Sequence, residues 1–270
     1  MAIDHAHWAQ YLLDGIDGRS EVTAITARLA DAGPDELAID DAYAIQAALL
    51  ELQLGRGDTL AGAKLGLTSA AKQEQMGVAE PVYGWVLQSS VVTDGEVPLS
   101  ELIHPRCEPE IVFVLAQDLA GPGLTGDDVL DASGRVVGGI EVIDSRYEAF
   151  SFTLPDVIAD NTSAARVAIG AEGIEPRAAD LTTLGCVFEI DGAVVGTAAG
   201  AALLGDPASC VAMLANHLGR HGQKLEAGWI VLAGAATDAH PLVPGTTATA
   251  RYSHLGPVTI TAHDRAGDRP

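Results

Sequence analysis

The sequence predicts an α+β protein in which an N-terminal helical arm, residues 1–58, lies on a mixed β body, residues 59–270. Apolar residues recur about every four positions near the N-terminus, whereas short apolar runs bounded by Gly and Pro follow from residue 60. Helices and strands do not alternate regularly, which disfavours a doubly wound parallel sheet. Without an internal repeat or a low-complexity linker, the two regions are expected to form one functional unit.

Two helices are predicted in the arm. The first is indicated by apolar residues four positions apart, Trp8, Leu12 and Ile16. The second is expected to begin at Ala42, with Asp40 or Asp41 as its N-cap, and to end at Gly55. Its apolar stripe consists of Ile45, Leu49 and Leu52.

Short apolar runs predict the strands of the body. These are Ile111–Leu115, Val136–Val142, Cys186–Ile190, Trp229–Ala233 and Val258–Ala262. One long helix, Pro207–Leu218, interrupts them, and the segments Gly121–Gly126 and Gly170–Asp180 are predicted to be surface loops.

Composition excludes several classes of protein. The net charge of −22 would repel nucleic acid and anionic membranes, so neither is expected as a partner. Three widely spaced cysteines without a CxxC pair argue against a structural zinc site or a disulfide framework and favour a cytoplasmic location. No secretory signal or membrane-spanning run is found, and HExxH, Walker and Gly-x-Gly-x-x-Gly motifs are missing.

The first candidate for chemistry is the segment His104-Pro105-Arg106-Cys107-Glu108-Pro109-Glu110, which leads into a predicted strand. Side chains two positions apart in a strand point to the same side, so Glu108 and Glu110 would project together. Two carboxylates held so close repel unless a cation or a proton lies between them. The alternative is an exposed strand edge on which both are solvated. Cys107, between them, is assigned a packing role.

Two further charged residues lie in apolar surroundings. Glu141 falls within the run from Gly138 to Ile143, where an unpaired carboxylate is costly. With Glu108 and Glu110 it would complete a site of three carboxylates suited to Mg²⁺ or Mn²⁺; alternatively, it pairs with an arginine, Arg146 or Arg106. Lys64 either extends to the surface or stays inside to meet an anion.

In their order and spacing, several motifs resemble the fumarylacetoacetase superfamily, and within it the branch of 2-oxo acid hydratases and decarboxylases. The resemblance extends from about residue 40 to residue 260. The motifs are Lys64-Leu65-Gly66-Leu67-Thr68-Ser69, Gln75-Met76-Gly77-Val78, His104-Pro105-x-x-Glu108-x-Glu110, Glu141-Val142-Ile143-Asp144-Ser145-Arg146-Tyr147, Ala159-Asp160-Asn161-x-Ser163, Leu204-Gly205-x-Pro207 and Val243-Pro244-Gly245. The resemblance implies a mixed β-roll fold of the fumarylacetoacetase type and a site in which Glu108, Glu110 and Glu141 bind Mg²⁺ or Mn²⁺.

Within that branch the chain looks more like the 4-oxalocrotonate decarboxylases than like the hydratases. Hydratases of this type carry Pro-Asp-Phe-Gly where this chain has Pro81-Val82-Tyr83-Gly84, so an acid is missing at Val82. The segments 143–150 and 211–216 and the residue Arg166 also resemble the decarboxylases. The expected reaction is loss of CO₂ from 2-oxo-3-hexenedioate, or a similar unsaturated 2-oxo diacid, giving 2-hydroxypenta-2,4-dienoate in aromatic hydrocarbon catabolism.

The resemblance also implies roles for residues around the metal. Lys64 would neutralise a carboxylate or donate a proton, Arg166 would meet the distal carboxylate, and Ser163 and Thr237 would hydrogen-bond the substrate. The substrate itself would chelate the metal, and because it contains its own electron sink, no organic cofactor is expected. A homo-oligomer is expected, and it could form a complex with a hydratase.

The resemblance leaves alternative functions open, and two residues depart from the family pattern. The alternative functions are a 2-hydroxypenta-2,4-dienoate hydratase on the same metal and a non-catalytic partner subunit of such a hydratase. A hydrolase of acylpyruvates is disfavoured because no convincing Glu-His pair is found. Asp238 and His240 stand where small or apolar residues are usual: they either face the pocket and alter the reaction or lie in a surface loop.

Overall fold

The computed structural model describes residues 3–33, 36–68, 73–74 and 81–264. The named helices are α1 His5–Gly18, α2 Ile25–Ala32, α3 Ile39–Gly55, α5 Gly126–Ala132, α6 Leu154–Ala159 and α7 Pro207–Arg220. The strands are β1 Leu60–Gly66, β2 Val82–Leu87, β3 Val91–Val92, β4 Glu96–Pro98, β5 Arg106–Leu115, β6 Ser133–Ile143, β7 Ala164–Ile174, β8 Gly185–Ile190, β9 Ala193–Ala199, β10 Ile230–Ala235, β11 His240–Pro241, β12 Thr247–Tyr252 and β13 Gly256–His263.

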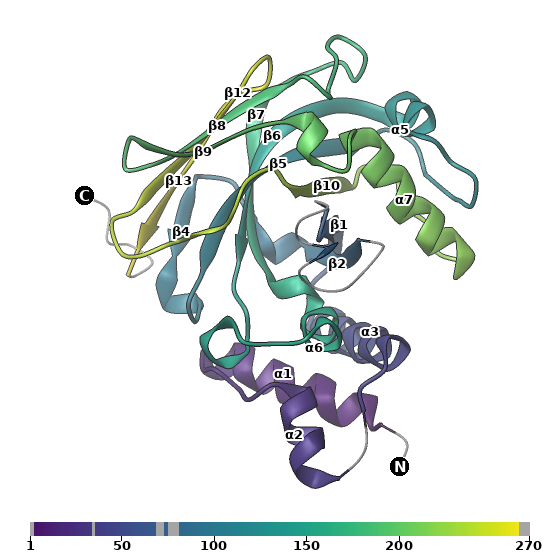
Figure 1. Ribbon diagram of the computed structural model, residues 1–270, viewed down its shortest axis with the longest axis vertical. Coiled ribbons are helices and arrows are strands. Elements are labelled where there is room, and N and C mark those ends of the chain that lie inside the picture. The colour runs from purple at the N-terminus through teal and green to yellow at the C-terminus, as the bar shows by residue number, and fades with distance from the viewer. Residues whose placement is uncertain (1–2, 34–35, 69–72, 75–80, 265–270) are drawn as a thin grey trace.

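These elements form two sheets beside a group of helices (Figure 1). The larger sheet has eight strands in the order β2-β1-β10-β5-β6-β7-β3, with β11 paired to β5, and the smaller has five in the order β4-β13-β12-β8-β9. Most neighbours are antiparallel, but β1–β10, β3–β7 and β4–β13 are parallel. The predicted α+β class, with N-terminal helices on a curled mixed sheet, is confirmed.

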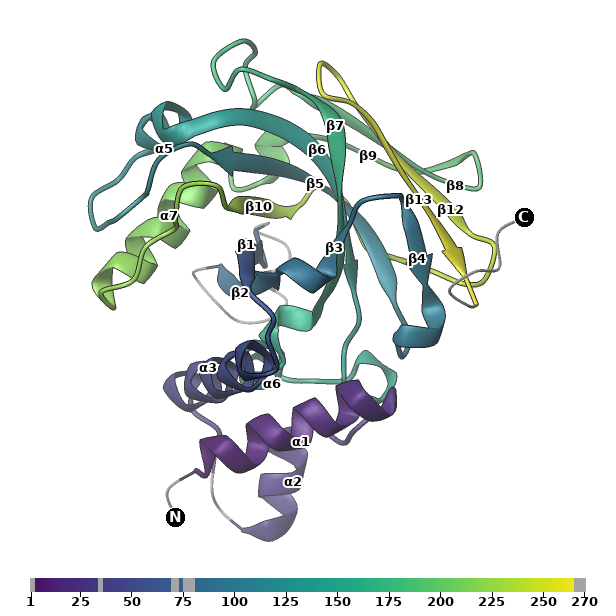
Figure 2. The same ribbon diagram turned by 180° about the vertical axis from the view of Figure 1, so that it is seen from behind.

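The helical arm packs beneath the larger sheet, with α1, α2 and α3 gathered around α6 (Figures 1 and 2). Its core is a separate apolar cluster in which Leu12, Ile45 and Leu49 meet Tyr147 and Ile158 of the body. Hydrogen bonds also join the two regions, because the backbone N–H of residue 22 donates to a carbonyl of residue 146 at 2.7 Å. Burial and backbone pairing together therefore fix the arm on the body.

The predicted helix cap at Asp40 or Asp41 is wrong. Helix α3 begins at Ile39 with Ala38 as its N-cap, and both aspartates lie in the first turn. Negative side chains there are stabilised by the positive end of the helix dipole, so a carboxylate signal at a helix start can lie one or two residues inside it. The helix ends at Gly55, as predicted.

The predicted loop Gly170–Asp180 is also partly wrong, because β7 extends to Ile174 and pairs with β6. The glycines that suggested a loop instead permit close approach of the neighbouring strand. A Cβ on Gly173 would lie 2.6 Å from the carbonyl oxygen of Val136. A glycine inside a strand can mark such an approach rather than a turn.

The main core lies between the two sheets and under α7. It is built chiefly from aliphatic residues, with Phe113 and Phe188 among the few aromatics. A smaller aliphatic cluster, including Val112, Val137 and Leu232, covers the other face of the large sheet. Among the described residues no helix is both long and apolar enough to cross a membrane.

Candidate metal centre

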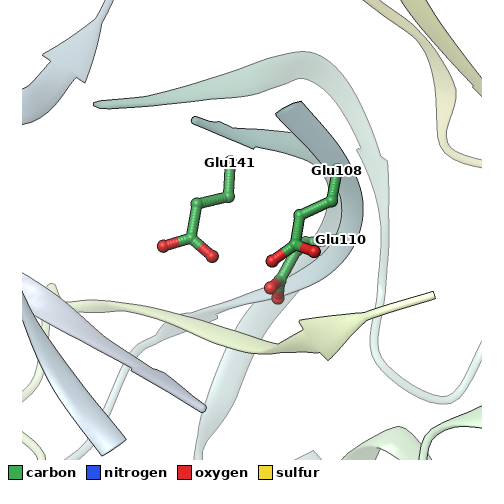
Figure 3. Close-up of side chains that lie close together, drawn as sticks. All are labelled: Glu108, Glu110 and Glu141. Atoms are coloured by element: carbon green, nitrogen blue, oxygen red, sulfur yellow. The ribbon is translucent and has the colours of Figure 1, made fainter. Parts of the chain in front are cut away.

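Three glutamates from two adjacent strands converge on one point (Figure 3). In the antiparallel register of β5 and β6, Glu108 lies directly opposite Glu141, and Glu110 lies opposite Gly139. Alternation along both strands therefore puts the three side chains on one face of the sheet. One oxygen from each carboxylate lies within 4.8 Å of the others.

All three carboxylates are buried, with exposed fractions of 7% for Glu108, 0% for Glu110 and 2% for Glu141. The exposed strand edge considered from the sequence is thus contradicted. The pairing of Glu141 with an arginine is contradicted as well, because the Arg146 guanidinium bonds to Asp160 and the Arg106 guanidinium lies over the Phe150 ring at 4.2 Å.

Lys64 is the cation that meets this cluster. It lies on β1 with 3% exposure, and its Nζ is 2.7 Å from Glu141 Oε2. The same ammonium donates a hydrogen bond to the carbonyl oxygen of Thr162 at 3.3 Å. Burial alone would lower the pKa of Lys64, but the carboxylates of Glu141, Glu108 and Glu110 raise it above its usual value. Lys64 is therefore held inside the protein as a cation.

A single ammonium does not balance three carboxylates. If all are ionised, three negative charges and one positive charge leave a net charge of −2 in a buried space. Burial, followed by the charge of Glu141, raises the pKa of Glu110 well above its usual value, and burial likewise raises the pKa of Glu141. A divalent cation would supply the missing charge, and carboxylate oxygens are the ligands preferred by Mg²⁺ and Mn²⁺.

Glu110 shows how the backbone supports this arrangement. Its Oε2 accepts a hydrogen bond of 2.7 Å from the backbone N–H of Gly234, whereas its buried Oε1 has no hydrogen-bond partner among the described residues. Gly234 has a φ of +113°, and a Cβ there would lie 1.9 Å from Thr68 Oγ1. Only glycine fits this position, and the remaining Glu110 oxygen is free to bind a cation.

A strained turn borders Lys64. Asn161, Thr162 and Ser163 have φ values of +50°, +51° and +58°. The left-handed conformation costs roughly 1–2 kcal/mol for each residue other than glycine, so surrounding contacts must hold the turn. Asp144 N–H donates to the carbonyl of Ser163 at 2.8 Å. Ser163 is 3% exposed, and its hydroxyl has no hydrogen-bond partner in the described part of the chain.

Of the other two predicted substrate contacts, Arg166 is not brought to the glutamates. Arg166 pairs in register with Val142, one position out of phase with Glu141, so it lies on the opposite face of the sheet. Its guanidinium forms an ion pair of 2.7 Å with Glu101. Thr237 is half-buried after β10, and a Cβ on Gly196 of β9 would lie 3.0 Å from its methyl group.

Asp238 and His240 also lie away from the cluster. Asp238 is exposed, in agreement with the surface alternative. His240 pairs with Cys107, so its side chain lies on the face of the sheet away from Glu108, and its ring centroid is 6.0 Å from that of Phe188. Burial raises the pKa of the Cys107 thiol to about 12, which suits the predicted packing role.

Sequence reasoning overlooked two backbone positions of the site: Gly234, and Thr162 through its carbonyl oxygen. An isolated glycine within an apolar strand is a signal of close approach, and Ala233-Gly234-Ala235 carries that signal. No comparable signal marks Thr162. The motif positions Ser69 and Gln75 to Val78 lie outside the described residues.

Known proteins of two activities are similar to this chain. It is 45% identical over 221 residues to 4-oxalocrotonate decarboxylase of Pseudomonas sp. (strain CF600), which spans 82% of this chain and 84% of that protein. It is 42% identical over 206 residues to 2-hydroxypent-2,4-dienoate hydratase of Pseudomonas putida, spanning 76% and 90%. No family model matches the chain.

Solved structures agree with this similarity. The structure of 4-oxalocrotonate decarboxylase from Pseudomonas putida G7, complexed with magnesium and adipate, has a TM-score of 0.90 and 39% identity and covers 96% of this chain and 97% of that one. Fumarylpyruvate hydrolase from Pseudomonas aeruginosa, at 14% identity and a TM-score of 0.58 over 74% of this chain and 88% of that one, shares the fold.

Proposed function

Because the chain belongs to the family of 4-oxalocrotonate decarboxylases and 2-hydroxydienoate hydratases, within the fumarylacetoacetase superfamily, we propose that it is a metal-dependent carboxy-lyase. Its substrate is 2-oxo-3-hexenedioate or a similar unsaturated 2-oxo diacid. The observation that carries this proposal is the buried cluster of Glu108, Glu110 and Glu141 with Lys64 beside it. The adipate in the similar structure is also a six-carbon diacid.

The three glutamates would hold Mg²⁺ or Mn²⁺, which supplies a Lewis acid for the 2-oxo group of the substrate. When the C6 carboxylate leaves C5 as CO₂, the C5–C6 electron pair forms the C4–C5 double bond. The C3–C4 pair then moves between C2 and C3, and negative charge collects on the 2-oxo oxygen. Protonation of that oxygen gives 2-hydroxypenta-2,4-dienoate, so all atoms and electrons are accounted for.

Lys64 and Ser163 are the residues proposed to assist at the developing charge. The Lys64 ammonium is held as a cation by Glu141 and by the Thr162 carbonyl, and therefore offers a positive charge and a proton without reorganising. The buried Ser163 hydroxyl has both a donor and an acceptor to offer. Burial of the cluster keeps water out, which strengthens these interactions.

Arg166 and Thr237 remain proposals for substrate contact. If Arg166 leaves Glu101 to meet the distal carboxylate, Arg166→Gln will raise KM, whereas Glu101→Gln, which breaks the same ion pair, will not. Equal effects of the two substitutions would assign Arg166 to the fold alone. For Thr237, the isosteric Thr237→Val tests whether its hydroxyl affects KM.

The hydratase is the second candidate, since a hydratase is nearly as similar in sequence. At the position where the resemblance places an acid in hydratases, this chain has Val82, which is 5% exposed and packed in the apolar cluster of the arm. That environment disfavours a carboxylate. The decarboxylase is therefore the better supported of the two. A non-catalytic subunit would have no physical need to retain three buried glutamates with Lys64.

The deciding experiment uses chelator-treated protein and 2-oxo-3-hexenedioate, with and without added Mg²⁺ or Mn²⁺. The proposal expects metal-dependent loss of substrate with an equal amount of CO₂. Formation of a 4-hydroxy-2-oxo acid from 2-hydroxypenta-2,4-dienoate, without CO₂ from the diacid, would instead establish the hydratase. Glu108→Gln and Glu141→Gln should each abolish turnover while the fold survives; retained activity and metal affinity would refute the site.

The predicted cellular location and assembly of the enzyme are part of the same proposal. The three cysteines are free and buried, which suits the reducing cytoplasm. A homo-oligomer, and a complex with a hydratase, can be tested by sedimentation of the purified chain with and without that hydratase.

A further inference from the structure

The turn at residues 161–163 approaches Lys64 over strand β2, at a position where β2 has a glycine and therefore no side chain. In the pairing of β1 with β2, Lys64 lies opposite Gly84. A Cβ on Gly84 would lie 2.3 Å from Thr162 Oγ1 and 2.7 Å from the carbonyl oxygen of Asn161. The turn therefore rests directly on the backbone of β2, and this contact lets the Thr162 carbonyl come within 3.3 Å of Lys64 Nζ.

One side chain holds the turn in this place. Asn161 Oδ1 accepts a hydrogen bond of 2.7 Å from the backbone N–H of Trp85, and its Nδ2 donates one of 2.9 Å to the carbonyl of the same residue. The Asn161 amide thus makes the two backbone hydrogen bonds that a neighbouring strand would otherwise make with Trp85, the residue after Gly84 in β2. Asparagine is also among the residues that tolerate a left-handed backbone best.

We infer that Asn161 is a positioning residue of the active site: its clamp on Trp85 sets the Thr162 carbonyl against Lys64 and fixes where Ser163 presents its hydroxyl. The side-chain hydrogen bonds of Asn161 join it to Trp85, so it acts on catalysis through its neighbours in the turn. The expected effect on the reaction rests on the proposed function, whereas the geometry of the clamp does not.

The glutamates should not depend on this clamp. Glu108, Glu110 and Glu141 are fixed by the pairing of β5 with β6, whereas Asn161 is joined to β2. Loss of the clamp should therefore reduce kcat and weaken diacid binding, while binding of Mg²⁺ stays close to that of the wild type. A residue that served only the fold would not separate these quantities.

The chain contains a matched control for the loss of such a clamp. Asn216, on α7, makes the same pair of bonds to one residue, because its Oδ1 accepts from Leu124 N–H at 2.8 Å and its Nδ2 donates to the Leu124 carbonyl at 2.8 Å. Both asparagines are partly buried. Asn216→Ala therefore removes equivalent hydrogen bonds, and these join α7 to Leu124 rather than to the turn or to Lys64.

The experiment compares Asn161→Ala, Asn161→Gly and Asn161→Asp with Asn216→Ala in the full-length protein. The measurements are kcat and KM with Mg²⁺ present, calorimetric titration with Mg²⁺ alone, and titration of the Mg²⁺-loaded protein with adipate. We expect kcat to fall roughly 10- to 100-fold in Asn161→Ala. Asn161→Gly, which permits the left-handed backbone but lacks the clamp, should fall similarly. Asn161→Asp keeps the acceptor for Trp85 N–H and should fall less.

Equal kcat values in Asn161→Ala and Asn216→Ala would overturn the inference, as would a full wild-type kcat in Asn161→Gly. If Asn161→Ala does not fold, Asn161→Asp, which loses one bond, carries the same comparison. If the wild type does not decarboxylate the diacid, the proposed function fails by itself. The clamp is then judged on adipate binding, which must weaken in the Asn161 variants and not in Asn216→Ala.

Discussion

Replacing Glu110 with glutamine should have opposite effects on metal binding and on the stability of the metal-free protein. The amide keeps the size of the side chain and an oxygen for Gly234 N–H, but it removes one charge from the cluster. Even at the largest separation of 4.8 Å, two carboxylates repel by about 3.5 kcal/mol at an effective dielectric constant of about 20. Glu110 is repelled by two such neighbours, Glu108 and Glu141, and its attraction to Lys64 offsets about one of these two repulsions.

The stability gained by the substitution depends on pH, because Glu110 in the wild type can avoid the repulsion by taking up a proton. Burial and the charge of Glu141 raise its pKa well above 4.5 in the folded protein, so the folded state holds this proton more tightly than the unfolded state. That contribution to stability is complete below the unfolded pKa of 4.5 and is lost as pH rises through the folded pKa, by up to about 1.4 kcal/mol per pH unit. Glutamine does not titrate.

The assay is thermal unfolding of chelator-treated wild type and Glu110→Gln between pH 4.5 and pH 8, followed by titration with Mg²⁺. The two proteins should have similar midpoints at the acid end. At pH 8 the variant should unfold up to roughly 10 °C higher, since about 3.5 kcal/mol is at stake. Mg²⁺ should raise the midpoint of the wild type alone. Parallel curves across this pH range, or equal stabilisation by Mg²⁺, would refute the description of a strained anionic site.

Three further predictions concern the supports of the cluster. Lys64→Met leaves Glu141 without its cation. The free energy of unfolding of the metal-free protein, measured in urea, should fall by about 3–5 kcal/mol, and turnover should be abolished. An active, equally stable variant would contradict the role of Lys64. Gly84→Ala should displace the turn, cost about 1–3 kcal/mol and lower kcat, so an unchanged kcat would show that the turn tolerates the methyl group. Asp160→Asn leaves the buried Arg146 guanidinium without an anion, and should cost about 3–5 kcal/mol by the same measurement; a loss below 1 kcal/mol would mean that water reaches this pair.

The three glutamates proposed as metal ligands could be predicted in part because they obey a local rule. Glu108 and Glu110 are two residues apart in a strand, and the two-residue period alone puts them on one face. Glu141 stood out because a charge within an apolar run is costly unless it is compensated. The pairing of β5 with β6 then brought all three together. Residue type and local period identified the candidates, but the choice of a metal site over an exposed strand edge or an arginine partner came from the resemblance to the family.

The partner of Lys64 could not be predicted in this way. Strand β1 contains two glycines and a lysine, so its composition does not resemble that of a strand, and it is held by non-local pairing with β2 and β10. The backbone conformation of the Asn161 turn was equally hidden, since three successive residues other than glycine adopt a left-handed backbone there. Such a conformation is imposed by contacts that form only in the folded protein, such as the clamp on Trp85.

The strand order has a consequence for when the site can form during synthesis. Strand β10 lies between β1, which carries Lys64, and β5, which carries Glu108 and Glu110, yet it is made well over a hundred residues after both begin. A growing chain can therefore pair β5 with β6 early, and it must hold three carboxylates without their lysine until residue 235 has left the ribosome. Available Mg²⁺ would offset two of the three negative charges of that intermediate, so the proposed ion would aid folding before it takes part in the proposed reaction.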